Sequence, residues 1–169
     1  MDLILWRHAD AGDPLEDPVA DLQRKLSGKG EKQAARMADW LNRFLPESTR
    51  VLVSPALRCQ QTVQALGRKF QTREPLGPGG SVTALLTLAR WPDRREPVLV
   101  VGHQPTLGMT AAMLMAGQGA SDEAAAGAAS AHATPAWSVR KGAVWWLRHR
   151  ERNGVAEVVL VSVRAPDNL

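Results

Sequence analysis

Three short, unbroken apolar runs are the feature that most restricts how this chain can fold. They cover residues 3–6, 51–53 and 98–101. A run without alternating polar residues is typical of a strand buried on both faces, and such strands occur in parallel sheets that helices cover on both sides. Each run is followed by apolar residues at helical spacing. The sequence therefore predicts strands that alternate with helices.

Four helices are expected after these runs. Ser27 offers an N-cap for the first helix, and Pro46 ends it. The pair Ser54-Pro55 supplies an N-cap and a first-turn proline for the second helix, whose apolar stripe reaches Phe70. The third and fourth helices are expected over residues 81–91 and from 106 to about 115.

The end of the chain has a different pattern. Asn153-Gly154 lies between two β-rich runs, 144–149 and 155–163, which is a strong signal for a hairpin. Residues 116–136 are rich in Ala and Gly and are expected to form a loop or excursion. The whole pattern predicts one domain over residues 1–169, a three-layer α/β/α fold. Its central sheet is mixed and mostly parallel, with a C-terminal antiparallel hairpin.

Composition excludes several classes of protein. Cys59 is the one cysteine, which rules out a disulfide framework and fits a reducing compartment. There is no Tyr and the six Trp are scattered, which argues against stacking platforms for single-stranded nucleic acid. No signal peptide and no membrane-spanning run is recognised, so a cytoplasmic protein is expected. The net charge of +4 leaves room for an anionic partner.

Polar side chains follow three of the expected strands, at the edge where ligands bind in open α/β sheets. Arg7 and His8 come after the first strand, Ser54 and Arg58 after the second, and His103 after the last of the three runs. Two arginines and two histidines suit a tetrahedral dianion such as phosphate, because guanidinium groups present rigid forks of donors. None of these signals is specific alone, but their joint placement is.

These residues resemble the signatures of the histidine phosphatase superfamily, the phosphoglycerate-mutase-like group. Residues 5–9, LWRHA, look like its R-H-G signature, and residues 53–62, VSPALRCQQT, are similar to S-P-x-x-R-x-x-Q-T. Residues 101–105, VGHQP, resemble the V-x-H-x-P of the SixA-type phosphohistidine phosphatase branch. Residues 24–30, RKLSGKG, look like that branch's R-x-L-T-x-x-G.

The resemblance implies a role for each matching residue. His8 would attack phosphorus and carry a covalent phosphohistidine. Arg7, Arg58 and Arg24 would bind the phosphoryl oxygens, and His103 would hydrogen-bond the transferred group from the opposite side. Neither a metal nor a cofactor is implied, because arginines take the place of the cation.

The sequence departs from the family pattern at two places. Ala9 stands where the superfamily signature has Gly. The stretch 75–80, in which larger members carry a general acid Glu, has no carboxylate. The first loop holds several acidic residues, most of which are interpreted as solvated loop charge: Asp10, Asp13, Glu16, Asp17 and Asp21. A site without a strong acid suits phosphohistidine, since imidazole leaves phosphorus more easily than an alkoxide does.

The leading hypothesis is a phosphohistidine phosphatase that acts on a phosphorylated protein, such as a histidine-containing phosphotransfer domain. Two alternatives stay open: a small-molecule phosphomonoesterase of the same superfamily, and a catalytically weak phosphate-binding module. The sequence does not indicate the oligomeric state.

Other functions are disfavoured by charge. The basic clusters 94–95 and 148–150 are short and adjoin acidic residues, which favours solvated faces over a nucleic-acid site. A metal held by His8, His103 and Asp10 is disfavoured, because neighbouring arginines would repel a cation.

Overall fold

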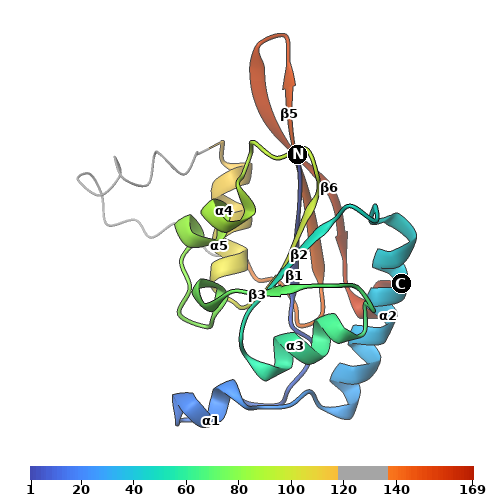
Figure 1. Cartoon of the computed structure of the whole chain (residues 1–169), viewed down its shortest axis with the longest axis vertical. Helices are drawn as coiled ribbons and strands as arrows, with labels where there is room; N and C mark the ends of the chain where they lie inside the picture. The colour runs from blue at the N-terminus through green and yellow to red at the C-terminus, as the bar shows by residue number, and fades with distance from the viewer. Residues whose placement is uncertain (118–136) are drawn as a thin grey trace, which may run out of the picture.

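A mixed six-stranded sheet forms the centre of the computed structural model, which describes residues 1–117 and 137–169 (Figure 1). The strands are β1 (Asp2–Arg7), β2 (Arg50–Val53), β3 (Gln71–Thr72), β4 (Val98–Gly102), β5 (Val144–Arg152) and β6 (Val155–Arg164). Their order across the sheet is β3-β2-β4-β1-β5-β6. The first four strands in that order are parallel, and β5 pairs antiparallel with both β1 and β6.

Helices cover both faces of the sheet. On one side lie α2 (Gly28–Phe44) and α3 (Leu57–Gln64), and on the other lie α4 (Val82–Ala89) and α5 (Thr106–Met115) (Figure 1). Strand β1 divides its side chains between two cores, because successive residues of a strand point to opposite faces. Ile4 and Trp6 pack in the core under α2 and α3, while Leu3 and Leu5 pack in the core under α4 and α5. The expected three-layer α/β/α fold is therefore confirmed.

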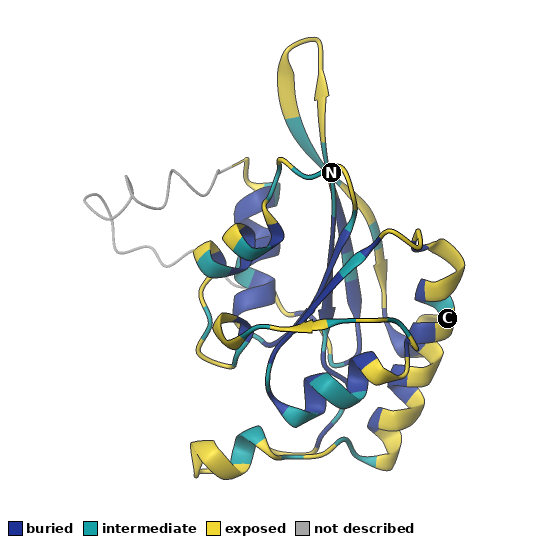
Figure 2. Ribbon diagram, in the orientation of Figure 1, coloured by how far each residue is buried: buried dark blue, intermediate teal, exposed yellow. Residues whose placement is uncertain are grey.

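The burial pattern explains the unbroken apolar runs. The central strands are buried along their length, whereas the far end of the hairpin is exposed (Figure 2). Every residue of β4 is buried. Since both faces of these strands contact helices, no alternating polar residue is tolerated in them.

The hairpin forms as the Asn153-Gly154 pair predicts. Both residues have positive φ, 54° and 74°, which a two-residue turn between right-twisted strands requires. Of the expected Ala-rich excursion over residues 116–136, only Ala116 and Gly117 fall within the described residues. The single-domain assignment over residues 1–169 stays a prediction.

Of the two helix starts predicted from N-cap residues, one agrees with the structure and one does not. Ser27 caps α2 as expected, its hydroxyl accepting from the Gly30 N–H at 3.0 Å. The prediction for Ser54-Pro55 was wrong, because α3 begins only at Leu57. The Ser54 hydroxyl is instead within 2.7 Å of a ring nitrogen of His103, and the helix ends at Gln64 rather than Phe70.

Three short elements complete the described chain: α1 (Pro18–Leu22) and the 3₁₀ turns η1 (Glu74–Leu76) and η2 (Pro166–Asn168). Over residues 1–117 and 137–169, no helix has the length and apolar character that crossing a membrane requires.

Gly30 fixes the approach of α2 to the loop after β1. A Cβ added there would overlap the backbone carbonyl of Asp10, whereas one added at Gly28 would meet nothing within 4 Å. We expect Gly30→Ala to lower the free energy of unfolding by about 2–3 kcal/mol, because backbone must shift to admit the methyl group. Gly28→Ala should leave it unchanged or raise it by up to about 1 kcal/mol. Urea denaturation of both variants measures the difference, and equal stabilities would contradict the packing.

Candidate active site

The carboxyl ends of β1, β2 and β4 bring the predicted side chains to one place. His8 follows β1 and His103 follows β4, and their ring centroids are 5.3 Å apart. A pocket of about 380 Å³ lies at this edge. The pocket is lined by all five side chains to which the family resemblance assigns a role: Arg7, His8, Arg24, Arg58 and His103.

His8 is held in one orientation and kept neutral. Its ring is buried, and Nδ1 lies 2.8 Å from the Ala9 carbonyl. A carbonyl only accepts, so Nδ1 carries the hydrogen and Nε2 keeps its lone pair. Burial, followed by the charges of Arg58 and Arg7, lowers the pKa of His8 to about 4, although the bond to Ala9 opposes the shift. A neutral imidazole with a free Nε2 is the form that can act as a nucleophile.

His103 is enclosed by polar groups from two elements. Its Nε2 lies 2.7 Å from the Ser54 hydroxyl, and its Nδ1 lies 3.4 Å from Nη2 of Arg58. Burial lowers the pKa of His103 to about 3, with further contributions from His8 and Arg58. This ring is therefore also neutral at ordinary pH.

The buried Arg58 and the half-buried Arg7 both line the pocket. Arg7 Nη1 donates to the Val139 carbonyl at 2.7 Å, and Arg58 Nη1 donates to the Asp21 carbonyl at 2.7 Å. Within the described residues, Nε of each arginine is buried without a hydrogen-bond partner. Unsatisfied buried donors are uncommon, and each calls for an explanation such as a catalytic role or a bound ion.

Asp21 forms ion pairs with two arginines of the pocket, Arg24 and Arg58, which corrects its interpretation as solvated loop charge. Its carboxylate pairs with Arg24 at 2.9 Å and with Arg58 at 3.1 Å. Burial opposes ionisation, but a hydrogen bond from the Leu15 N–H and the two arginines hold the pKa of Asp21 below its usual range. Arg24 also donates to the carbonyls of Ala11 and Gly12, so it ties the first loop to the pocket.

Lys141 was missed by the sequence analysis. It lines the pocket, and its Nζ lies 2.7 Å from a carboxylate oxygen of Asp10. Hydrogen bonds from Lys141 and Ser27 lower the pKa of Asp10, so Asp10 too is a paired carboxylate rather than solvated loop charge. Nothing in the spacing indicated this pair, because 130 residues separate its members along the chain.

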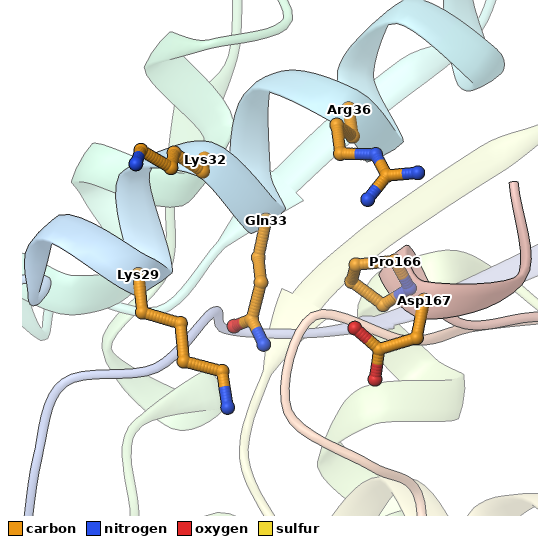
Figure 3. A pocket seen from close by; sticks show the side chains of 6 residues that line it. All are labelled: Lys29, Lys32, Gln33, Arg36, Pro166 and Asp167. Atoms are coloured by element: carbon orange, nitrogen blue, oxygen red, sulfur yellow. The ribbon is translucent and has the colours of Figure 1, made fainter.

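A second pocket, of about 320 Å³, lies between α2 and η2 (Figure 3). Gln33 points into it between Lys29 and Asp167, as the figure shows. The Gln33 Oε1 atom accepts from the Asp10 N–H at 2.9 Å, which braces the loop after β1. No histidine lines this pocket, so it lacks the nucleophile that the first pocket contains.

Comparison with known proteins agrees with the geometry. Residues 3–76 match the model of the histidine phosphatase superfamily (branch 1). The chain is 33% identical over 127 residues to the phosphohistidine phosphatase SixA of Escherichia coli (strain K12), a match that covers 70% of this chain and 76% of the relative. The chain belongs to the histidine phosphatase superfamily. Its resemblance to the SixA branch is thereby confirmed.

Two further comparisons extend the likeness. An uncharacterized protein of Picosynechococcus is 37% identical over 125 residues, which cover 70% of this chain and 75% of that protein. The structure of the protein histidine phosphatase SixA complexed with tungstate superposes with a TM-score of 0.68 at 26% identity and covers 99% of both chains.

The two departures from the superfamily pattern have structural explanations. Ala9 is buried and is not among the described residues with positive φ, so the backbone does not require Gly there. The carboxylates on the pocket wall are Asp13 and Asp21, and Glu74 is not part of that wall. Because Asp21 is ionised and paired, it is not a proton donor at neutral pH.

Among the residues that the structure describes, no group of three or more His, Cys, Asp and Glu side chains is gathered as a metal site requires. Metal independence of this histidine phosphatase stays a prediction.

The low pKa of His8 predicts an unusual titration. An ordinary histidine gains its proton near pH 6.5, but we expect His8 to remain neutral when the pH falls from 7 to 5 and to protonate only near pH 4. The chemical shifts of its ring nitrogens in NMR spectra report this directly. A midpoint near 6.5 would show that burial and the arginines do not control the ring.

Arg58 should dominate the affinity for an anion. We expect Arg58→Ala to weaken binding of inorganic phosphate by about 10- to 100-fold, because hydrogen bonds to charged groups contribute roughly 1.5–3 kcal/mol. Isothermal calorimetry measures the change. Arg94→Ala is the matched control, since Arg94 pairs with Glu96 away from the pocket. Equal affinities in the two variants would exclude Arg58 from the anion site.

Proposed function

We propose that this protein is a phosphohistidine phosphatase that removes phosphate from a histidine-phosphorylated protein through a covalent intermediate on His8. The observation that carries the proposal is the pairing of two neutral, buried imidazoles with Arg7 and Arg58 around one pocket. A site that only bound an anion would gain more from protonated histidines than from neutral ones. Neutral rings suit nucleophilic attack and hydrogen bonding.

The first half of the reaction transfers the phosphoryl group to His8. The lone pair on Nε2 attacks phosphorus in line, and the bond between phosphorus and the substrate nitrogen breaks. Arg7, Arg58 and His103 stabilise the charge that spreads over the phosphoryl oxygens. When the other ring nitrogen of the substrate histidine is protonated, that imidazole leaves as a neutral group.

The second half regenerates the enzyme. Water attacks phosphorus, the bond to His8 Nε2 breaks, and inorganic phosphate leaves. Arginines supply the positive charge that a metal ion supplies in other phosphatases. The hydrogen bond from Nδ1 to the Ala9 carbonyl keeps the ring in the same tautomer and orientation before and after transfer.

The choice of phosphohistidine over an ordinary phosphate ester rests on proton supply. An alkoxide needs a proton in the transition state, and the pocket wall offers Asp13 and the paired Asp21. The relative named phosphohistidine phosphatase SixA supports the same substrate class. Asp13 is the observation that favours the alternative, a small-molecule phosphomonoesterase, since its carboxyl group could act as the acid.

The nucleophile is tested by substitution. We expect His8→Ala to reduce hydrolysis of an aryl phosphate in the presence of EDTA by at least about 10³-fold, since removing a covalent nucleophile eliminates the main route. His149→Ala is the control, because His149 lies on β5 outside the pocket. Labelled phosphate should be trapped on His8 after a rapid quench. Activity that survives in His8→Ala would refute the covalent route, and an inactive wild-type chain would favour the binding module.

A substrate panel separates the two enzyme hypotheses. We expect kcat/KM for a phosphohistidine protein to exceed that for an alkyl phosphate by about 10²-fold or more, the lower range of what general acid catalysis contributes. Comparable values for the two substrates would overturn the preference for phosphohistidine. If Asp13→Asn selectively lowered alkyl phosphate turnover, Asp13 would be the acid and the monoesterase would be the better description.

A further inference from the structure

Three cations lie along one stripe of α2 and line the pocket between α2 and η2. They are Lys29, Lys32 and Arg36, whose spacing of three and four residues places them on the same face of the helix. All three are exposed. In the part of the chain that the structure describes, the two lysines have no hydrogen-bond or ion-pair partner, and Arg36 donates to the Leu169 carbonyl at 3.3 Å. The proposed mechanism does not use these cations.

Gln33 adds a directed donor to the same pocket. Its side chain points into the pocket (Figure 3), although the residue is only 9% exposed. Because the Asp10 N–H can only donate, the bond of 2.9 Å between them requires Oε1 to face Asp10. The amide nitrogen, Nε2, therefore faces the other way. Within residues 1–117 and 137–169 it has no acceptor, and it is not sealed from solvent. Its two hydrogens are available to a ligand.

The second pocket adjoins the catalytic pocket at residues 141–142. Lys141 lines the catalytic pocket. A Cβ added to the next residue, Gly142, would lie 2.8 Å from Pro166 and 3.4 Å from Gln33, which both line the second pocket. Asp10 connects the two pockets as well, since its carboxylate pairs with Lys141 and its N–H donates to Gln33. A protein surface that covers the catalytic pocket therefore also reaches the second one.

The chemistry of the second pocket suits a carboxylate side chain. A carboxylate only accepts hydrogen bonds, and its two oxygens can accept from the Gln33 amide and from an ammonium group at once. Asp167 is the one carboxylate among the described residues that line this pocket, so the three cations outnumber it. A nucleic acid carries a charge on every phosphate of its backbone, and some of these charges would approach Asp167. An acidic protein places single carboxylates further apart.

We propose that the pocket between α2 and η2 is a docking site for an Asp or Glu side chain of the phosphorylated protein, which accepts from Gln33 Nε2 between the cations of α2 while the phosphohistidine occupies the catalytic pocket. This inference rests on the proposed function, because it requires a protein substrate. Attraction between the cations and an acidic surface raises kcat/KM for that protein without altering the chemical step at His8.

Two synthetic peptides test the docking. Each contains one phosphohistidine, flanked on both sides by glutamates in the first peptide and by glutamines in the second. We expect kcat/KM of the wild-type protein to be about 10-fold higher for the glutamate peptide at low salt, and the difference to shrink as salt is added. Hydrolysis of an aryl phosphate reports on the catalytic pocket alone, because this molecule has no group that reaches the second pocket.

Charge reversal locates the effect. In the double variant Lys29→Glu/Lys32→Glu the preference for the glutamate peptide should disappear. The double variant Arg43→Glu/Lys69→Glu is the matched control, since it changes the net charge equally. Arg43 lies on the same helix outside the pocket, and Lys69 lines a different pocket. The control should keep the preference, and both variants should hydrolyse the aryl phosphate at similar rates.

The side-chain amide signals of Gln33 in NMR spectra report docking without hydrolysis. We expect them to shift when the unphosphorylated glutamate peptide is added to the wild-type protein, and to stay in place with the glutamine peptide.

The outcomes separate this inference from the proposed function. Equal kcat/KM for the two peptides, or a Gln33 amide that does not respond to the glutamate peptide, would overturn the docking site, and neither measurement needs a variant to fold. Tighter binding of an oligothymidylate of equal charge would assign the pocket to nucleic acid and overturn it as well. If Gln33 responds to the glutamate peptide but neither phosphohistidine is hydrolysed, the proposed function fails while the docking of an acidic chain stands.

Discussion

The register of β1 against β4 determines the geometry of the pocket. Arg7 lies opposite Gly102, and the His8 N–H donates to the Gly102 carbonyl at 3.1 Å, so the next residue of each strand brings an imidazole to the same edge. A slip of one residue would turn Ile4 and Trp6 away from the core under α2 and α3. The apolar pattern of β1 thus fixes the distance between two catalytic candidates that are 95 residues apart in the sequence.

Ion pairs hold most of the cationic side chains of the pocket in place. Three arginines and a lysine line the pocket, and two carboxylates anchor three of these four side chains: Asp21 pairs with Arg24 and Arg58, and Asp10 pairs with Lys141. The histidines contribute no charge, because burial beside arginines keeps them neutral. The site therefore combines fixed positive charge with an unprotonated imidazole nitrogen, which is the combination that the proposed function requires. The excess of four positive charges in the whole chain adds little to this local effect.

The sequence predicted the parts of the site that strand ends deliver. Arg7 ends β1, while His8 and His103 directly follow β1 and β4. Arg58 lies on the helix after β2, so the convergence of these side chains follows from the fold class and from the family signatures. Asp21 could not be singled out among five acidic residues of one loop, since its pairing depends on where that loop packs. Lys141 comes from a segment that only the antiparallel return of β5 brings near Asp10.

Local sequence patterns do not predict the role of a residue that contacts a segment distant along the chain. Ser54-Pro55 has the composition of a helix start, yet the Ser54 hydroxyl lies beside His103 and α3 begins later. Ser27 does cap α2 as its type predicts, but the need for Gly at position 30 comes from the Asp10 backbone, with which a side chain there would overlap. In both cases the role of the residue depends on packing against elements that are distant along the chain, so it could not be predicted from neighbouring residues.

The environment of Cys59 bears on how this chemistry tolerates oxidants. The sulfur is buried next to His103, and its high pKa leaves almost no thiolate at neutral pH. Oxidation of cysteine proceeds through the thiolate and requires access to solvent. Since the nucleophile that we propose is an imidazole, and the one thiol of the chain is shielded in this way, the proposed reaction is chemically suited to continue in the presence of peroxide.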